Sequence, residues 1–247
     1  IWHTESNSSP LMYWSLRQRD ELAARLDHVA DVHLAMRYGE PSIRSVLDQL
    51  RDQGVQRVLI IPAYPQYASS STAPVIDEVA RDMLNARNQL EIRTIRSFHD
   101  APVYIEALAA ALVNHWDARG RPDFEGGDKL VLSFHSIPEA MHRDGDVYRD
   151  ECETTAELLR SRLNLDSQWV LTRYQSVFGP AKWIGPATID TMGELGAVGT
   201  TRVDVICPGF VADCIETLDE IARLNRDAFI EAGGSQFHYV PWGNDLP

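Results

Sequence analysis

Hydrophobic positions recur along this chain with two alternating spacings. Short continuous apolar runs are typical of buried strands, and between them apolar residues return every three or four positions, as in amphipathic helices. The short runs predict strands at 32–36, 57–62, 91–95, 129–134, 169–174, 202–207 and 237–240. The longer periodic stretches predict helices at 10–26, 42–53, 72–90, 102–116, 148–163, 187–195 and 212–231. Strands that alternate with helices in this way indicate parallel sheets covered by helices.

A turn-rich segment at 118–127 divides this series into two halves. It contains Gly120, Pro122, Gly126 and Gly127, which break both helix and strand. We therefore predict an α/β protein of two Rossmann-like lobes, an N-terminal lobe at 1–118 and a C-terminal lobe at 119–247, each with a parallel sheet.

Composition narrows the range of partners. The 247 residues carry 23 Lys and Arg against 36 Asp and Glu, a formal net charge of −13. Nucleic-acid binding needs a basic surface, so this charge argues against such a partner. Neither a dinucleotide-binding fingerprint nor a P-loop follows a predicted strand, and no apolar run reaches the length of a membrane span.

The cysteine content indicates the cellular compartment and limits the possible cofactors. Cys152, Cys207 and Cys214 are the three cysteines of the chain. A low, odd count fits a reducing cytoplasm better than a disulfide framework. It is also one short of the four thiolates that usually hold an iron–sulfur cluster, so we expect no cluster.

The first candidate for chemistry is His135, which follows the buried run 130–132 at the start of a long loop. Ligands of open parallel sheets bind beyond the carboxyl ends of the strands, so a histidine here can meet a substrate. A lone histidine is more often structural than catalytic, but a place after a buried strand, in a loop too long for a mere connection, favours the two roles about equally. A tyrosine, Tyr148, follows in the same region and could serve packing or binding.

The second candidate is the acidic run that follows the predicted strand 202–207 and the turn 207–209. On one helix, Asp213, Glu216 and Glu220 would share a face. Acidic residues in the first turns of a helix also favour its dipole and often only face water. With a histidine, however, they would form a nitrogen–oxygen site suited to Fe(II) or Zn(II), and a histidine of ordinary pKa accepts protons near neutral pH.

Two further segments could line a pocket for a flat ligand. The loop 63–72 carries Tyr64, Tyr67 and several hydroxyl residues after a strand, and the alternative is a loop that only caps the next helix. Trp183, in the long loop after the strand 169–174, could stack on a planar ligand or anchor its loop to the core.

Along nearly its whole length the chain resembles the ferrochelatases, which insert ferrous iron into a porphyrin. The resemblance rests on several motifs in one order with compatible spacing. They are Tyr64-Pro65-Gln66-Tyr67 with Ser71-Thr72, Ser133-Phe134-His135-Ser136-Ile137-Pro138, Gly145-Asp146 with Tyr148, Tyr174-Gln175-Ser176, Phe178-Gly179-Pro180 with Trp183, and Cys207-Pro208-Gly209-Phe210 through Ile221. It implies the two-lobed type II chelatase fold with a cleft between the lobes.

The resemblance also implies roles for single residues. His135 would be the catalytic histidine and Glu216 the facing acid, and both would be ligands of the iron. Asp213 and Glu220 would extend the acidic line as a relay. Tyr67, Tyr148 and Trp183 would line the porphyrin cleft.

Several positions depart from the pattern of the family. Ser136 follows the histidine where many members have Gly, and Ala140 stands where some have an arginine. Cys214 replaces a second histidine, and Ser69 stands where animal members have a cluster-ligating cysteine. By the same resemblance, the first strand of the family with its active-site loop and hydrophobic lip would precede Ile1, and a final helix would follow Pro247.

The predicted function is thus that of a cytoplasmic, monomeric ferrochelatase of heme biosynthesis. Its partners would be ferrous iron as substrate and protoporphyrin IX or coproporphyrin III, with contact to a membrane surface left open and no cofactor required. Two alternatives stand beside it. One is a sirohydrochlorin chelatase, which would be expected to place two histidines in its site, and the other is a tetrapyrrole-binding module without catalysis.

Overall fold

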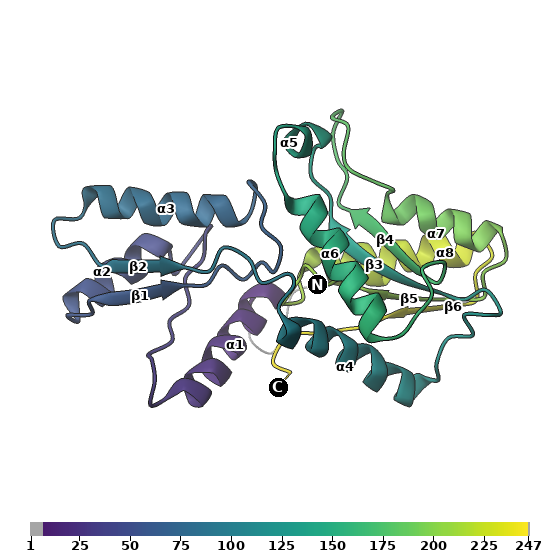
Figure 1. Ribbon diagram of the computed structural model, residues 1–247, viewed down its shortest axis with the longest axis horizontal. Coiled ribbons are helices and arrows are strands. Elements are labelled where there is room, and N and C mark those ends of the chain that lie inside the picture. Colours follow the sequence, from purple (N-terminus) through teal and green to yellow (C-terminus); the bar gives the residue numbers. More distant parts are fainter. Residues whose placement is uncertain (1–6, 247) are drawn as a thin grey trace.

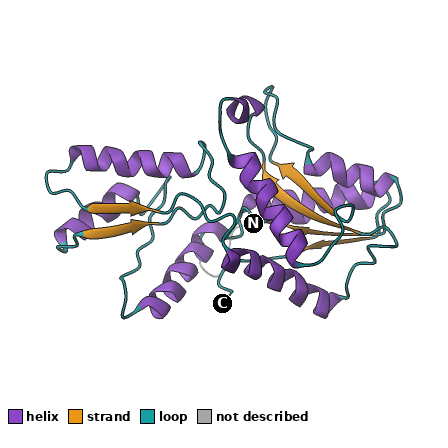
Figure 2. Ribbon diagram, in the orientation of Figure 1, coloured by secondary structure: helices purple, strands orange, loops and turns teal. Residues whose placement is uncertain are grey.

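The computed structural model describes residues 7–246, and these form two lobes of different size (Figures 1 and 2). The smaller lobe has a two-stranded parallel sheet of β1 (Arg57–Ile60) and β2 (Glu91–Thr94). Helices α2 (Ile43–Asp52) and α3 (Thr72–Asn85) cover one face of it. Alternate residues of β1, Val58 and Ile60, pack on the cluster that these helices contribute, whereas Leu59 between them is 55% exposed.

The larger lobe holds a four-stranded parallel sheet in the order β4-β3-β5-β6. Its strands are β3 (Lys129–His135), β4 (Val170–Gln175), β5 (Arg202–Ile206) and β6 (Gln236–Tyr239). Because all four are parallel, their carboxyl ends lie at one edge of the sheet, and His135 is the last residue of β3.

Both faces of this sheet are buried. On β3, Leu130, Leu132 and Phe134 join the core under α4 (Pro102–Arg119) and α6 (Tyr148–Arg162). Val131 points to the other face, into a core shared with α7 (Thr188–Ala197), η1 (Glu216–Asn225) and α8 (Arg226–Glu231). Two buried faces explain why the strand has a continuous apolar sequence.

Helix α4 belongs to the packing of the larger lobe. Its residues Leu108 and Leu112 are fully buried in the core that β3 and α6 complete, and Trp116 donates a hydrogen bond to Asp204 of β5. The boundary predicted between residues 118 and 119 therefore falls after an element that the second sheet already buries. Turn residues mark a break in the backbone, but the core decides which elements pack together.

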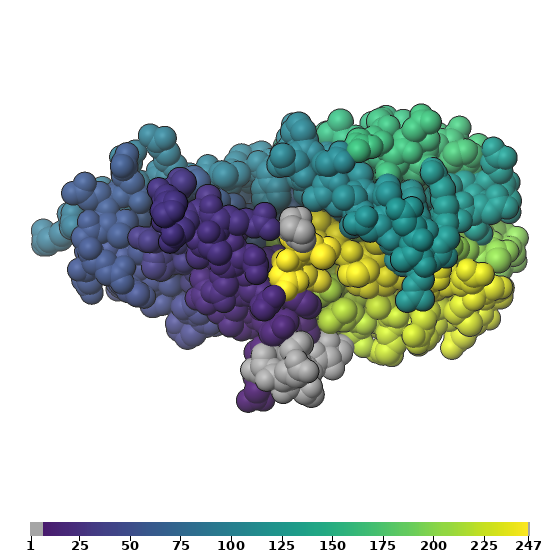
Figure 3. All heavy atoms as spheres, turned by 90° about the horizontal axis from the view of Figure 1, so that it is seen from below, coloured from purple at the N-terminus to yellow at the C-terminus, as the bar shows by residue number. Residues whose placement is uncertain are grey.

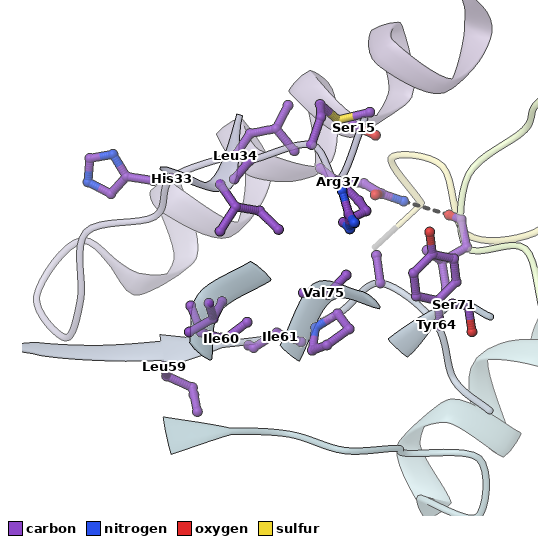
Figure 4. A pocket seen from close by; sticks show the side chains of 18 of the residues that line it. Ser15, His33, Leu34, Arg37, Leu59, Ile60, Ile61, Tyr64, Ser71 and Val75 are labelled. Atoms are coloured by element: carbon purple, nitrogen blue, oxygen red, sulfur yellow. Dashed lines mark hydrogen bonds between the residues drawn. The ribbon is translucent and has the colours of Figure 1, made fainter. Parts of the chain in front are cut away.

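The segment predicted as a strand at 32–36 is extended without being a strand. Among the described residues it makes a single bridge, between Met36 and Ser42, and it pairs with no strand. A cavity separates it from β1 (Figure 4). An apolar run forms a strand only when a neighbouring strand completes its backbone hydrogen bonds.

The acidic run also differs from the predicted single α-helix at 212–231. Asp213 precedes the helix, residues Glu216–Asn225 form the π-helix η1, and α8 follows directly. The side-chain amide of Asn225 donates to the carbonyl of Glu220, five residues back. The face predicted for Asp213, Glu216 and Glu220 assumed α-helical turns, and this geometry does not form.

Helix α1 (Pro10–Leu26) lies against both the smaller lobe and the C-terminal segment (Figure 3). Arg17 pairs with Asp245 at 2.7 Å, and the side chain of Gln18 donates to the carbonyl of Val211 at 2.6 Å. The short helix α5 (Glu139–Arg143) lies in the loop predicted after His135. No helix in the described part of the chain has both the length and the apolar character needed to cross a bilayer.

Candidate active site

A cavity of about 1070 Å³ runs between the lobes and reaches the carboxyl edge of the larger sheet. The smaller lobe and α1 contribute mostly apolar side chains to it, and Figure 4 shows α1 and the segment with Leu34 on one wall and β1 on the other. The larger lobe contributes His135, Tyr148, Cys214 and Glu216. The two residues predicted to act as a pair therefore line one cavity.

The imidazole of His135 is oriented by the chain that follows it. Its Nδ1 lies 2.5 Å from the carbonyl oxygen of Ser136. A carbonyl oxygen only accepts, so Nδ1 carries a hydrogen, and in the neutral imidazole the lone pair is then on Nε2. Ser136 is itself fixed, because its N–H donates to the Gln175 carbonyl at 2.8 Å and its hydroxyl to the Ile184 carbonyl at 2.8 Å.

Glu216 is the first residue of η1, in the connection that follows β5. The amide of Gln175 donates to its backbone carbonyl at 2.9 Å, and Gln175 is the residue opposite His135 in the register of β3 and β4. One buried glutamine thus links the acid's helix to the strand position beside the histidine. In the sequence Gln175 stands out only as part of a motif, because a glutamine side chain by itself does not indicate a chemical role.

Cys214 occupies the same wall as Glu216. Burial, and then the nearby Glu216 carboxylate, raise the pKa of the Cys214 thiol far above its ordinary value. The thiol is therefore neutral at physiological pH, and on its own it is a weak ligand because metals bind the thiolate.

The other two acids of the run are held by hydrogen bonds. Asp213 is buried and accepts from the hydroxyls of Thr217 and Tyr239 and from the amide of Asn244, at 2.6 to 2.8 Å. Glu220 accepts from both the N–H and the hydroxyl of Ser176, each at 2.6 Å. The geometry places Asp213 in the protein interior and ties Glu220 to the loop after β4.

The three aromatic residues predicted to line a cleft are placed differently from one another. Tyr148 lines the cavity, although its side chain is mostly buried in the core. The ring of Tyr67 is covered by the guanidinium of Arg96 at 4.0 Å, and Trp183 packs against Phe178 with ring centroids 4.7 Å apart. Neither Tyr67 nor Trp183 contributes to the cavity wall, and the roles assigned to them stay predictions.

Tyr64 lines the cavity in place of Tyr67. Burial, followed by nearby groups that include Cys214 and Glu216, raises the pKa of the Tyr64 hydroxyl. The phenol therefore stays protonated beside the acid and can donate a hydrogen bond. Both tyrosines lie in the loop 63–72, and strand register alone could not tell which one faces inward.

The sequence of the chain matches the family model described as Ferrochelatase over residues 2–247. The chain belongs to the ferrochelatase family. It is 48% identical over 251 residues to a ferrochelatase of Bordetella pertussis, covering all of this chain and 67% of the relative. It is 44% identical over 247 residues to a ferrochelatase of Neisseria meningitidis, covering all of this chain and 71% of the relative.

Solved structures support the same fold with little sequence identity. SirB from Bacillus subtilis with Fe3+ superposes with a TM-score of 0.66 at 14% identity, covering 94% of this chain and 85% of that one. The sirohydrochlorin chelatase SirB from Bacillus subtilis subspecies spizizenii, in complex with cobalt, gives a TM-score of 0.60 at 13% identity. The match covers 91% of this chain and 80% of that one. These likenesses confirm the α/β type II chelatase fold.

Membership of the family confirms the predicted enzyme class and reaction. Ferrochelatases are lyases that insert iron into a porphyrin in heme biosynthesis, and the whole chain falls within the family model. Porphyrin and metal are accordingly its substrates, as the sequence predicted.

Proposed function

We propose that this chain inserts Fe(II) into a porphyrin in the cavity between its lobes, with His135 and Glu216 as the reacting pair. The observation that carries the proposal is that both side chains line one cavity although they come from separate strand–loop connections. An imidazole nitrogen and a carboxylate form a donor set suited to ferrous iron. The iron is a substrate here, so the site needs to bind it and also to release it to the macrocycle.

The proton balance of the reaction gives His135 its role. A free-base porphyrin loses two pyrrole protons as the metal enters, and the metal–nitrogen bonds replace the two nitrogen–hydrogen bonds. Nε2 of His135 has its lone pair available because Nδ1 is held by the Ser136 carbonyl, so it accepts the first proton. The carboxylate of Glu216 holds the ion and takes the second proton on its way to water.

The acidic relay has one strong candidate beyond Glu216. Glu220 lies on the same π-helix and is linked through Ser176 to the end of β4. A carboxylate there lowers the cost of moving positive charge along η1. For Asp213 we propose an indirect part, because its three hydrogen bonds fix the chain just before Cys214 and Glu216.

The cavity wall suits a flat apolar macrocycle with polar edges. We propose that Tyr148 and Tyr64 contact the porphyrin, and that Tyr67 and Trp183 support the loops around it. A close-fitting wall also favours a distorted macrocycle whose pyrrole lone pairs point toward the metal.

We further propose that the protein acts as a cytoplasmic monomer without a resident cofactor, using a membrane surface at most as a source of porphyrin. The acidic composition supports this view, as do the three cysteines, which are buried and one short of the four thiolates that usually hold an iron–sulfur cluster. Size-exclusion chromatography with light scattering and a vesicle sedimentation assay test the oligomeric state and the surface contact.

The deciding experiment is anaerobic metal insertion followed by porphyrin absorbance. The protein is mixed with Fe(II) or Zn(II) and with protoporphyrin, coproporphyrin or sirohydrochlorin, and the collapse of the free-base Q bands is recorded. We expect insertion into the first two porphyrins, its loss in His135→Ala and a strong reduction in Glu216→Gln. His28→Asn, which changes a 95% exposed histidine side chain, is the matched control.

The alternatives give different results in the same assay. Insertion into sirohydrochlorin alone would identify the related chelatase reaction. Tight porphyrin binding without a change of the Q bands would identify a carrier. Full activity in His135→Ala would refute the role assigned to this histidine.

A further inference from the structure

Two histidines and an aspartate meet on the face of the larger sheet that α4 covers. They are His115 of α4, Asp204 of β5 and His238 of β6, and Asp204 and His238 are direct partners in the register of the two strands. One ring nitrogen of each histidine and one carboxylate oxygen lie within 4.8 Å of one another. Within the described residues this is the group of three or more such side chains that could hold a metal ion.

The group is separate from the reaction site. Asp204 lies opposite Leu130 in the register of β5 and β3, and His135 follows Leu130 by five residues on β3. At about 3.3 Å per residue, the two sites are roughly 16 Å apart along the strands. None of the three residues lines the cavity between the lobes.

Within the part of the chain that the structure describes, the hydrogen bonds leave both imidazoles with a free nitrogen. Nδ1 of His238 lies 3.1 Å from a carboxylate oxygen of Asp204, so Nδ1 donates and, in the neutral imidazole, the lone pair is on Nε2. Nε2 of His115 is buried and has no hydrogen-bond partner among residues 7–246. The two rings are neighbours, with centroids 5.2 Å apart at an interplanar angle of 63°.

An unpartnered buried nitrogen is uncommon in a folded protein and needs an explanation. A cation between the two rings would supply one. Histidines that bind metals commonly hold their other ring nitrogen against a carboxylate, which is the relation of His238 to Asp204.

The surroundings of Asp204 decide which kind of cation fits. Its carboxylate is fully buried and accepts two hydrogen bonds from Arg202, at 2.8 and 2.9 Å, and one from Trp116 at 2.8 Å. Arg202 balances the charge of the acid, so the imidazoles are the main donors. Imidazole donors favour Zn(II), Co(II) and Ni(II) over Mg(II) or Ca(II), which prefer oxygen ligands.

We propose that His115 and His238, oriented by Asp204, form a second metal site for a borderline divalent cation of the Zn(II) class. A cation there joins α4 to the edge strand β6 and stabilises the packing of this helix on the sheet. The proposal does not depend on the reaction assigned to His135 and Glu216.

Cobalt titration tests the site in solution. Because His135 and Glu216 are expected to bind metal as well, the background is the His135→Ala protein. We expect one equivalent of Co(II) with visible d–d bands, and at least about tenfold weaker binding when His115→Asn or His238→Asn is added. His28→Asn is the matched control and should leave the binding unchanged. Equal Co(II) affinity with and without His115→Asn would refute the site.

A second measurement needs no substitution at the site. Crystals of the unsubstituted protein soaked in Zn(II) are measured on both sides of the zinc absorption edge. An anomalous peak at about 2.0–2.1 Å from a ring nitrogen of His115 and of His238 supports the proposal. A well-occupied peak at His135 with none between these two rings would overturn it, even if the variants fail to fold.

Discussion

The side-chain amide of Gln175 donates a 2.9 Å hydrogen bond to the backbone carbonyl of Glu216. Gln175 is also the register partner of His135, and the oxygen of its side-chain amide accepts a hydrogen bond from the Ser133 hydroxyl at 2.8 Å. Its exposed fraction is 2%. The position of the acid relative to the histidine thus depends on a buried residue that has no part in the chemistry.

We expect Gln175→Ala to slow metal insertion on the order of ten- to hundredfold, the usual effect of losing a group that orients a ligand. The porphyrin KM should change much less than kcat, because the cavity wall is intact. Steady-state kinetics with zinc and a free-base porphyrin measure both. Gln168→Ala, at an exposed position, is the control, and a change confined to KM would contradict the positioning role.

Ser176 holds Glu220 with two hydrogen bonds, and its backbone lies in the left-handed region at φ 64°. Ser176→Ala removes the hydroxyl and keeps the N–H. We expect kcat for insertion to fall while the dissociation constant of the porphyrin, measured by fluorescence quenching, stays the same. Ser161→Ala on the exposed face of α6 should leave both kcat and the dissociation constant unchanged. A weaker porphyrin complex with unchanged kcat in Ser176→Ala would argue against a relay through Glu220.

Glu151 of α6 connects the two lobes. Its carboxylate accepts from the backbone N–H of Tyr67 at 2.7 Å and pairs with Arg96 at 3.0 Å. Glu151→Ala leaves a half-buried N–H without its partner, so we expect a loss of about 1–3 kcal/mol in the free energy of unfolding. Urea denaturation measures it, with Glu153→Ala as the exposed control. Equal stability of the two variants would show that this link contributes nothing.

Helix α4 places six buried residues in the core of the larger lobe. Leu112 is fully buried, whereas its neighbour Val113 is 42% exposed. We expect Leu112→Ala to lower the free energy of unfolding by about 2–5 kcal/mol and Val113→Ala to change it by about 0.5 kcal/mol or less. Thermal or urea unfolding of both variants compares them directly. Similar losses would mean that α4 does not pack as described.

Burial raises the pKa of all three thiols, Cys152, Cys207 and Cys214. A raised pKa means fewer thiolates at a given pH, and the thiolate is the form that reacts. At pH 8 we therefore expect iodoacetamide to alkylate the native protein far more slowly than the protein in urea, with Cys214 reacting first because it lines the cavity. Mass spectrometry of timed samples identifies the sites. Rapid alkylation of all three cysteines at pH 8 would contradict their burial.

Local sequence determined the strands of the larger sheet and the chemistry at its edge. Leu130, Val131 and Leu132 form a continuous apolar run because both faces of β3 are buried, and that signal needs no knowledge of distant residues. His135 follows from the same run, since a strand that ends in a turn places its next polar residue at the carboxyl edge. The motifs around it were enough to indicate the family before any coordinates.

Tertiary contacts decided the features that depend on partners distant in the chain. Residues 32–36 have a strand-like pattern yet pair with no strand among the described residues, and α4 joins the lobe that its core contacts select. Distant partners also determine three further features. They are the π-helical turns of η1, the position of Tyr64 rather than Tyr67 in the cavity wall, and the contact between the rings of His115 and His238. Hydrophobic spacing reports which side of an element is buried, but only the packed chain determines what lies against that side.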